Sequence, residues 1–130
     1  MKKSTIESMV GKKIVAIRLD KGVCGGLIIG LDDGLVYQTY DYDQACCSER
    51  YMTSDESDED LVYYEGAAFL GFSFGDYTEG RPPEIEDEYN NFDDTRFVQV
   101  KTSKGVFTMC AHNRHNGCYE GISIECKVIA

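Results

Sequence analysis

The sequence predicts an α+β fold in which a bent antiparallel sheet, or a partly open barrel, of about six or seven strands carries two short helices. Three observations support this prediction. Apolar residues alternate along several short segments, Asp-Gly and Lys-Gly pairs separate neighbouring segments, and two serines stand where helices typically begin. The 130 residues are enough for one core, so we expect a single globular domain over residues 1–130.

The two serines predict where the helices lie. Ser4 and Glu7 have the spacing of a capping box, in which each side chain satisfies a free backbone amide, so a short helix to about Val10 is expected. Ser57 precedes several acids that favour the positive end of a helix, and Gly66 can adopt the left-handed conformation that ends one. A second short helix is therefore expected between Ser57 and Gly66.

Alternation and turn residues predict the strands. The predicted segments are residues 12–19, 26–31, 35–40, 67–74, 95–102, 106–112 and 119–129. Tight turns are predicted at Asp33-Gly34, Lys104-Gly105 and Asn116-Gly117. The rows expected to share a face are Val15, Ile17 and Leu19; Phe107, Met109 and Ala111; and Ile122, Ile124, Cys126 and Val128.

The net charge of −10 is concentrated in two segments. Residues 41–60 contain eight acids and one arginine, and residues 76–94 contain the same numbers. Residues 75–94 also contain glycine and proline without an apolar period, which predicts an irregular acidic loop. This charge distribution disfavours direct binding to nucleic acid or to membrane phosphate. It favours either solvated loops that keep the protein soluble or an acidic face that binds a basic partner.

The six cysteines are expected to be reduced thiols. The N-terminus has no apolar run of secretory length, and no stretch approaches the length that spans a bilayer. These features predict a soluble cytoplasmic protein without a disulfide framework. Cys46 and Cys47 are adjacent, so they should face different environments, one inward and the other outward near Tyr40 and Tyr42.

Tyrosines, arginines and acids provide the candidate binding residues. Tyrosine offers rigid amphipathic contact area, arginine suits a phosphate or carboxylate, and the acids suit a basic partner protein. The predicted ligand- or partner-binding residues are Tyr40, Tyr42, Cys47, Arg50, Asp55, Glu56, Asp58, Glu59, Arg96, Arg114 and Tyr119. Core and edge packing is the alternative explanation for most of the tyrosines.

Four potential metal ligands lie within nine residues: Cys110, His112, His115 and Cys118. Their spacing matches no common zinc module, so polar turn residues and buried thiols are the favoured interpretation. No cofactor or metal is expected. The same histidines could serve a cysteine nucleophile, but no spacing in the chain requires a catalytic site.

Several motifs, taken in order, resemble an uncharacterised family of small phage and prophage proteins. The motifs are Gly11-Lys-Lys-Ile14, Asp33-Gly34, Gln44-Ala-Cys-Cys47, Lys104-Gly105 and Asn116-Gly-Cys-Tyr119. The chain departs from the family pattern at Tyr42, where the family has histidine, and at Ala45 and Ser48, where it has acids. The resemblance implies a viral or mobile-element origin and a mixed, β-rich fold. The family has no established activity to transfer.

The leading functional hypothesis is a phage-encoded, non-enzymatic binding protein in the host cytoplasm. It would inhibit a host or defence protein through its acidic loops, or sequester a small anionic ligand. One alternative is a virion accessory or assembly protein that acts through attachment or self-association as a homo-oligomer. A second alternative is a metal- or thiol-dependent enzyme.

Overall fold

The computed structural model describes residues 4–22, 25–43, 49–80, 92–115 and 121–130. Its helices are α1 (Thr5–Met9), α2 (Asp58–Leu61) and the 3-10 turn η1 (Val62–Tyr64). Its strands are β1 (Ile14–Leu19), β2 (Leu27–Leu31), β3 (Val36–Asp41), β4 (Glu49–Ser54), β5 (Phe69–Phe74), β6 (Phe92–Thr102), β7 (Gly105–His115) and β8 (Ile124–Val128). Among these residues, no helix has both the length and the apolar character needed to cross a bilayer.

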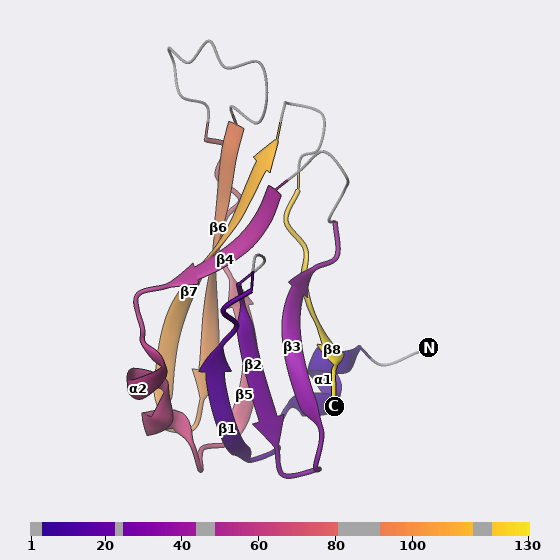
Figure 1. Ribbon diagram of the computed structural model, residues 1–130, viewed down its shortest axis with the longest axis vertical. Coiled ribbons are helices and arrows are strands. Elements are labelled where there is room, and N and C mark those ends of the chain that lie inside the picture. Colours follow the sequence, from indigo (N-terminus) through magenta and orange to yellow (C-terminus); the bar gives the residue numbers. More distant parts are fainter. Residues whose placement is uncertain (1–3, 23–24, 44–48, 81–91, 116–120) are drawn as a thin grey trace.

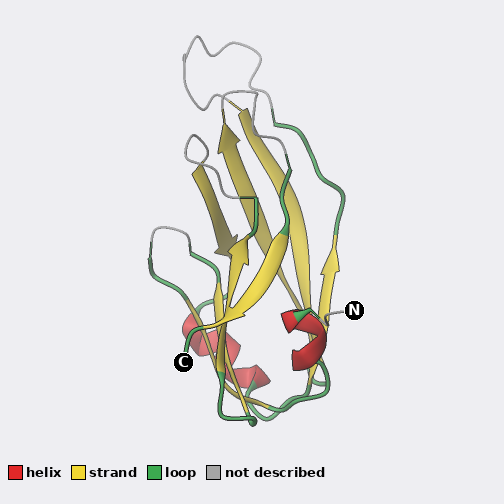
Figure 2. Ribbon diagram, turned by 90° about the vertical axis from the view of Figure 1, so that its right-hand side faces the viewer, coloured by secondary structure: helices red, strands yellow, loops and turns green. Residues whose placement is uncertain are grey.

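The described strands form two antiparallel sheets packed as layers (Figures 1 and 2). The strand order is β1-β2-β3-β8 in the first sheet and β4-β7-β6-β5 in the second. The predicted α+β class with antiparallel pairing is confirmed. In the described part of the chain the eight strands divide into two four-stranded sheets, and neither sheet closes into a barrel.

The hydrophobic core lies between the two sheets and includes residues from both helices, such as Met9 and Leu61. The predicted inward row of β7 is confirmed, because its three members are all buried: Phe107, Met109 and Ala111. The predicted row near the C-terminus is buried at Ile122, Ile124 and Cys126. Val128 is instead 50% exposed, because it lies at the end of an edge strand.

The face predicted for β1 is wrong at one residue. Ile14 and Ile17 are buried, whereas Val15 is 53% exposed. The register between β1 and β2 shifts between Ile14 and Ala16, as in a β-bulge. A bulge adds one residue to one strand and so interrupts the alternation of faces. Val15 consequently points away from the core, while Ile17 faces it.

Both helix starts form as the sequence predicts. The Ser4 hydroxyl accepts a hydrogen bond from the Glu7 amide at 3.2 Å. Ser57 forms a complete capping box with Asp60, in which each side chain accepts from the other residue's amide. Gly66 has the predicted left-handed conformation, with a φ of 90°. These caps fix two helices that are too short to be stable by themselves.

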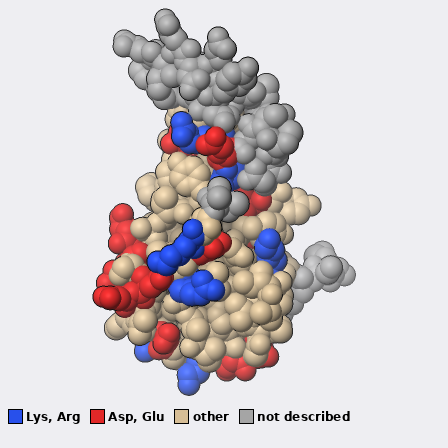
Figure 3. All heavy atoms as spheres, in the orientation of Figure 1, with Lys and Arg blue, Asp and Glu red and all other residues tan. Residues whose placement is uncertain are grey.

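The acidic segments contain more regular structure than their composition predicts. Strand β4 lies within residues 41–60, and β6 begins at Phe92, inside the segment expected to be a loop. Thr78 and Thr95 form an isolated β-bridge, so part of residues 75–80 also pairs with β6. Residues 81–91 lie outside the described residues. Among the described acids, Figure 3 shows a cluster over α2.

Candidate functional site

A pocket of about 270 Å³ lies where β3 and β8 of the first sheet approach β4 of the second. Two of the predicted binding residues, Tyr40 and Arg50, line it. The full lining is Thr39, Tyr40, Asp41, Arg50, Tyr51, Met52, Ile124 and Lys127. The pocket therefore joins residues that are far apart in the sequence, and it depends on how the two sheets meet.

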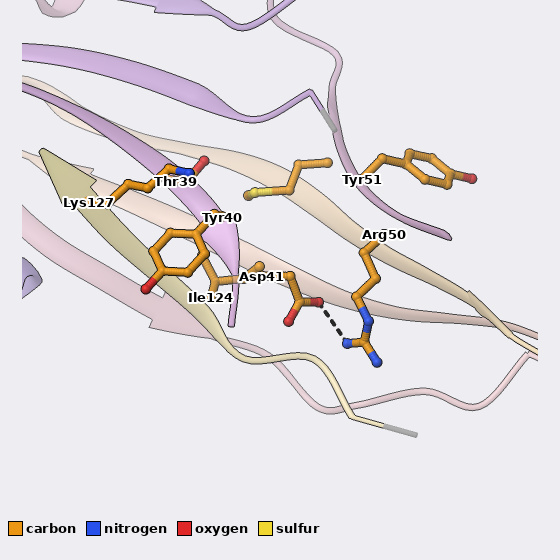
Figure 4. Close-up of a pocket in the computed structure, with 8 residues that line it drawn as sticks. Thr39, Tyr40, Asp41, Arg50, Tyr51, Ile124 and Lys127 are labelled. Atoms are coloured by element: carbon orange, nitrogen blue, oxygen red, sulfur yellow. Dashed lines mark hydrogen bonds and ion pairs between the residues drawn. The ribbon is translucent and has the colours of Figure 1, made fainter. Parts of the chain in front are cut away.

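A buried ion pair forms one wall of the pocket. Arg50 Nη1 lies 3.0 Å from Asp41 Oδ2, and the two side chains are 2% and 8% exposed (Figure 4). The same Nη1 donates to the Gly121 carbonyl at 2.6 Å, while Asp41 Oδ1 accepts from the Asp43 and Ser123 amides. A buried pair needs such additional hydrogen bonds, because both charges have lost water. The positive charge of Arg50 is thus balanced by the Asp41 carboxylate and by the hydrogen bond to the Gly121 carbonyl.

The opposite side of the pocket combines apolar surface with an exposed ammonium. Met52 and Ile124 are buried and provide apolar contact area. The Lys127 Nζ lies 5.2 Å from the centroid of the Tyr40 ring, which is a cation–π contact. In Figure 4 the Tyr51 ring points away from the other side chains. The pocket can therefore accept an apolar group and place an anion near Lys127.

A second, more open groove of about 480 Å³ shares Tyr40 with the first pocket. Its lining also includes Tyr42, which is 70% exposed, and the buried Cys126. The other lining residues are Ser4, Thr5, Ser123 and Glu125. Burial raises the pKa of the Cys126 thiol to about 12. Cys126 consequently remains a neutral core side chain and is a poor nucleophile.

A family model matches residues 7–126 of the chain. The chain belongs to DUF7448, a domain of unknown function. The predicted membership of an uncharacterised family is confirmed at this level. The match begins within α1 and ends within β8, so it includes every lining residue of the pocket except Lys127. No curated protein and no solved structure matches the chain.

The structure of the DUF7448 domain separates the two other predicted arginines from the pocket. Arg96 donates to the Gly75 carbonyl at 2.9 Å and to the Ile122 carbonyl at 3.2 Å, so it joins the second sheet to the segment before β8. Arg114 is exposed on the outer face of β7, opposite Asp93. The predicted arginines therefore do not form one anion site.

The four predicted acids near α2 differ in what they contact. Asp55 and Glu59 are exposed, and Glu56 is half-buried. Asp58 accepts a hydrogen bond from the Leu19 amide at 2.7 Å, and this bond lowers the pKa of its carboxyl group. Asp58 thus ties α2 to β1, whereas Asp55 and Glu59 face solvent.

The candidate metal ligands, for which the sequence favours a role without metal, do not converge within the described residues. Cys110 and His112 lie on the outer face of β7, whereas His115 lies on the buried inner face. Nowhere in the described ranges do three or more His, Cys, Asp or Glu side chains form a group that could hold a metal. Cys118 falls outside the described residues, as do the predicted binding residues Cys47 and Tyr119.

His112 is the centre of a polar cluster on the outer face of the second sheet. Its Nε2 lies 3.1 Å from Thr53 Oγ1, its Nδ1 lies 3.3 Å from Asp93 Oδ1, and its ring stacks on Tyr51. A hydroxyl, an imidazole and a carboxylate in this order resemble a nucleophile with its base. Burial raises the pKa of the neighbouring Cys110 thiol, which disfavours a thiolate there. The sequence analysis does not predict this cluster. Thr53 lies in β4 and Asp93 in the first part of β6, and neither segment was expected to be a strand.

A buried polar network extends from the inner face of β6 to the pocket. His115 Nε2 lies 2.5 Å from Asp94 Oδ2, and both residues are 1% exposed. The Tyr77 hydroxyl donates to the same carboxylate and accepts from the Gly121 amide. Burial raises the pKa of Tyr77 to about 12. Because the Gly121 carbonyl accepts from Arg50, the network ends at the pocket wall.

Proposed function

We propose that this DUF7448 domain is a non-enzymatic binding protein that sequesters a small anionic ligand carrying one apolar ring. The observation that supports the proposal most directly is the pocket between β3, β4 and β8, which has apolar walls and the Lys127 ammonium beside them. In line with the family resemblance, we propose that the protein is encoded by a phage and acts in the host cytoplasm.

The size and polarity of the pocket restrict the ligand class. A volume of about 270 Å³ is at the lower end for small-molecule sites, so it suits one ring with a charged substituent. The Asp41 carboxylate already compensates Arg50, so Lys127 is the positive charge most directly presented to the ligand. The ligand ring would pack on Met52 and Ile124, and its anionic group would contact Lys127.

Calorimetric titration with three matched probes tests this proposal: phenyl phosphate, benzyl alcohol and benzylamine. The anion should bind best and benzylamine worst, because the probes share a ring and differ in charge. Lys127→Gln should weaken the binding of phenyl phosphate about tenfold or more, as expected for the loss of a hydrogen bond to a charged group. Tyr40→Ala should weaken the binding of both the anionic and the neutral probe, because Tyr40 lines the pocket.

Lys101→Gln is the matched control, because Lys101 is exposed on the outer face of β6 and the substitution changes the charge equally. It should leave all three affinities unchanged. Equal affinity for the three probes, or equal effects of the two lysine substitutions, would contradict an anion site in this pocket.

A second candidate function is inhibition of a basic host or defence protein through the surface of α2. The favouring observation is that the exposed side chains of Val62 and Tyr63, at 54% and 63%, follow the exposed Glu59 within about one helical turn. Such a surface combines a charge that steers association with contact area. Neutralising Asp55, Glu56 and Glu59 should weaken capture of the partner and its salt dependence. Asp58 should not be substituted in this test, because its carboxylate accepts the hydrogen bond from the Leu19 amide that ties α2 to β1.

A further inference from the structure

Two neighbouring recesses meet at Tyr40 and carry opposite charges. Tyr40 lines both the pocket and the open groove. In the pocket Asp41 balances Arg50, which leaves Lys127 as the positive side chain presented to a ligand. Glu125 is the charged side chain in the lining described for the groove, and it forms no ion pair with any residue that the structure describes. An ammonium and a carboxylate, neither of them in an ion pair with a described residue, therefore lie next to the same tyrosine.

Strand β8 fixes the spacing of these two charges. Glu125 and Lys127 are two positions apart on one face of the strand, which separates their Cα atoms by about 7 Å. Tyr40 is the cross-strand partner of Glu125, and its ring centroid lies 5.2 Å from Lys127 Nζ. A short flexible arm that passes Tyr40 can therefore connect a group held at Lys127 with one held at Glu125.

The groove offers hydrogen-bond acceptors to its occupant. An ionised carboxylate, such as that of Glu125, can only accept. The Ser123 hydroxyl already donates to Asp43 Oδ2 at 2.6 Å, so its lone pairs remain for a donor. Tyr42, which is 70% exposed, adds an aromatic ring, and the face of such a ring attracts a cation. The group that suits this groove both donates hydrogen bonds and is positively charged, as an alkylammonium is.

We propose that the ligand is a zwitterion, in which the anionic group at Lys127 continues into a short ammonium-bearing arm that crosses Tyr40 and ends at Glu125. This inference rests on the proposed function, because the arm starts from the ring and the anion held in the pocket. Glu125 is then the residue that selects among anions with the same ring. An apolar arm would desolvate the Glu125 carboxylate without a partner, whereas an ammonium arm forms an ion pair with it.

Calorimetric titration with three phosphodiesters of phenol tests this selection. They share the phenyl ring and the singly charged phosphate, and their second ester group is propyl, 2-hydroxyethyl or 2-aminoethyl. The three arms are nearly equal in length and differ in the terminal group. The aminoethyl ester should bind about five- to tenfold more tightly than the propyl ester, because Glu125 is half-buried and gains a charged hydrogen bond. The affinity of the hydroxyethyl ester should fall between the two.

Glu125→Gln keeps the size of the side chain and removes its charge. In this variant the affinities of the aminoethyl and propyl esters should agree to within about twofold. Glu59→Gln is the matched control, because Glu59 is exposed on α2, which is tied to β1 at the far edge of the first sheet from β8. It should leave the preference for the aminoethyl ester unchanged.

Three results would overturn the inference: equal affinity for the propyl and aminoethyl esters, a preference that Glu125→Gln leaves intact, or tightest binding by the hydroxyethyl ester. If in any of these cases the propyl ester binds and Lys127→Gln weakens its binding, the anion site stands and only the ammonium arm is wrong. If none of the three esters binds, the proposed function fails together with the inference.

Discussion

The inner face of the β6–β7 hairpin has two halves with opposite chemistry. Near the turn that connects the strands, this face carries Val98, Val100, Phe107 and Met109, which are all buried in the hydrophobic core. Toward the other end, the same two strands and the same face carry Asp94, Asn113 and His115, which are equally buried. We call these the apolar half and the polar half.

The comparison shows that burial in this fold is achieved in two ways. The apolar half excludes water by packing, which is non-directional and tolerates variation in shape. The polar half must satisfy each donor and acceptor, since a buried unpaired group costs more than a hydrogen bond contributes. The pocket adjoins the polar half through Arg50 and Gly121. The proposed site therefore lies next to the hydrogen-bonded, orientation-specific part of the protein.

Removing the central carboxylate of the polar half should have the largest effect. Asp94→Ala leaves His115 and the Tyr77 hydroxyl buried without their shared acceptor. We expect a loss of about 4 kcal/mol in the free energy of unfolding, measured by urea denaturation. Asp93→Ala is the control, because that neighbouring side chain is 43% exposed; it should cost less than about 0.5 kcal/mol. Similar losses for the two variants would refute a stabilising polar network.

A cavity in the apolar half should have a somewhat smaller effect. Met109 is 1% exposed, and Met109→Ala should cost about 3 kcal/mol through lost transfer energy and the cavity left behind. The loss should be the same from pH 6 to 9 within about 0.5 kcal/mol, since no titratable group is removed. Urea denaturation at several pH values measures it. A cost below about 1 kcal/mol would show that this half is loosely packed.

Raising the pH should destabilise the polar half through Tyr77, with a smaller effect than the two substitutions above. The pKa of Tyr77 is raised to about 12 by burial and by its hydrogen bond to Asp94. Its ordinary value is 10.0, so this contribution to stability is complete below pH 10 and is lost as the pH rises toward 12. Tyr37 and Cys126, whose pKa values are also raised to about 12, should contribute in the same direction.

Tyr77→Phe tests this contribution. In this variant the free energy of unfolding should still decrease at alkaline pH, but by less than in the unmodified chain. The remaining fall should come from Tyr37 and Cys126. Absorbance of tyrosinate during the titration reports the ionisation directly. If Tyr77→Phe removes an absorbance step near pH 10 instead of near pH 12, and leaves the alkaline fall unchanged, the raised pKa of Tyr77 is contradicted.

The sequence predicts the apolar half much better than the polar half. Alternation along β7 identifies Phe107, Met109 and Ala111 as buried, and the glycine turns identify the hairpins, because both signals are local. Strand β4 escapes prediction, since its inward positions include Arg50, which does not look like a buried residue. The bulge in β1 has no sequence signal of its own.

The candidate site could be predicted only in part. Tyr40 and Arg50 are candidates from residue type alone, and both line the pocket. Lys127 and Met52 are missed, because the pocket forms only when the edges of two sheets meet. The Asp94–His115 contact spans 21 positions, and no spacing rule connects two residues on adjacent long strands without the register.

Nuclear magnetic resonance of ¹⁵N-labelled protein titrated with phenyl phosphate tests the central claim most directly. We predict saturable shifts of the amides of Tyr40, Arg50 and Lys127 around the pocket, with little change at Val98 and Val100 in the apolar half. The same shifts should be weaker with benzyl alcohol and absent with benzylamine. Shifts centred on the apolar half, or a response equal for all three probes, would contradict a ligand site beside the polar half.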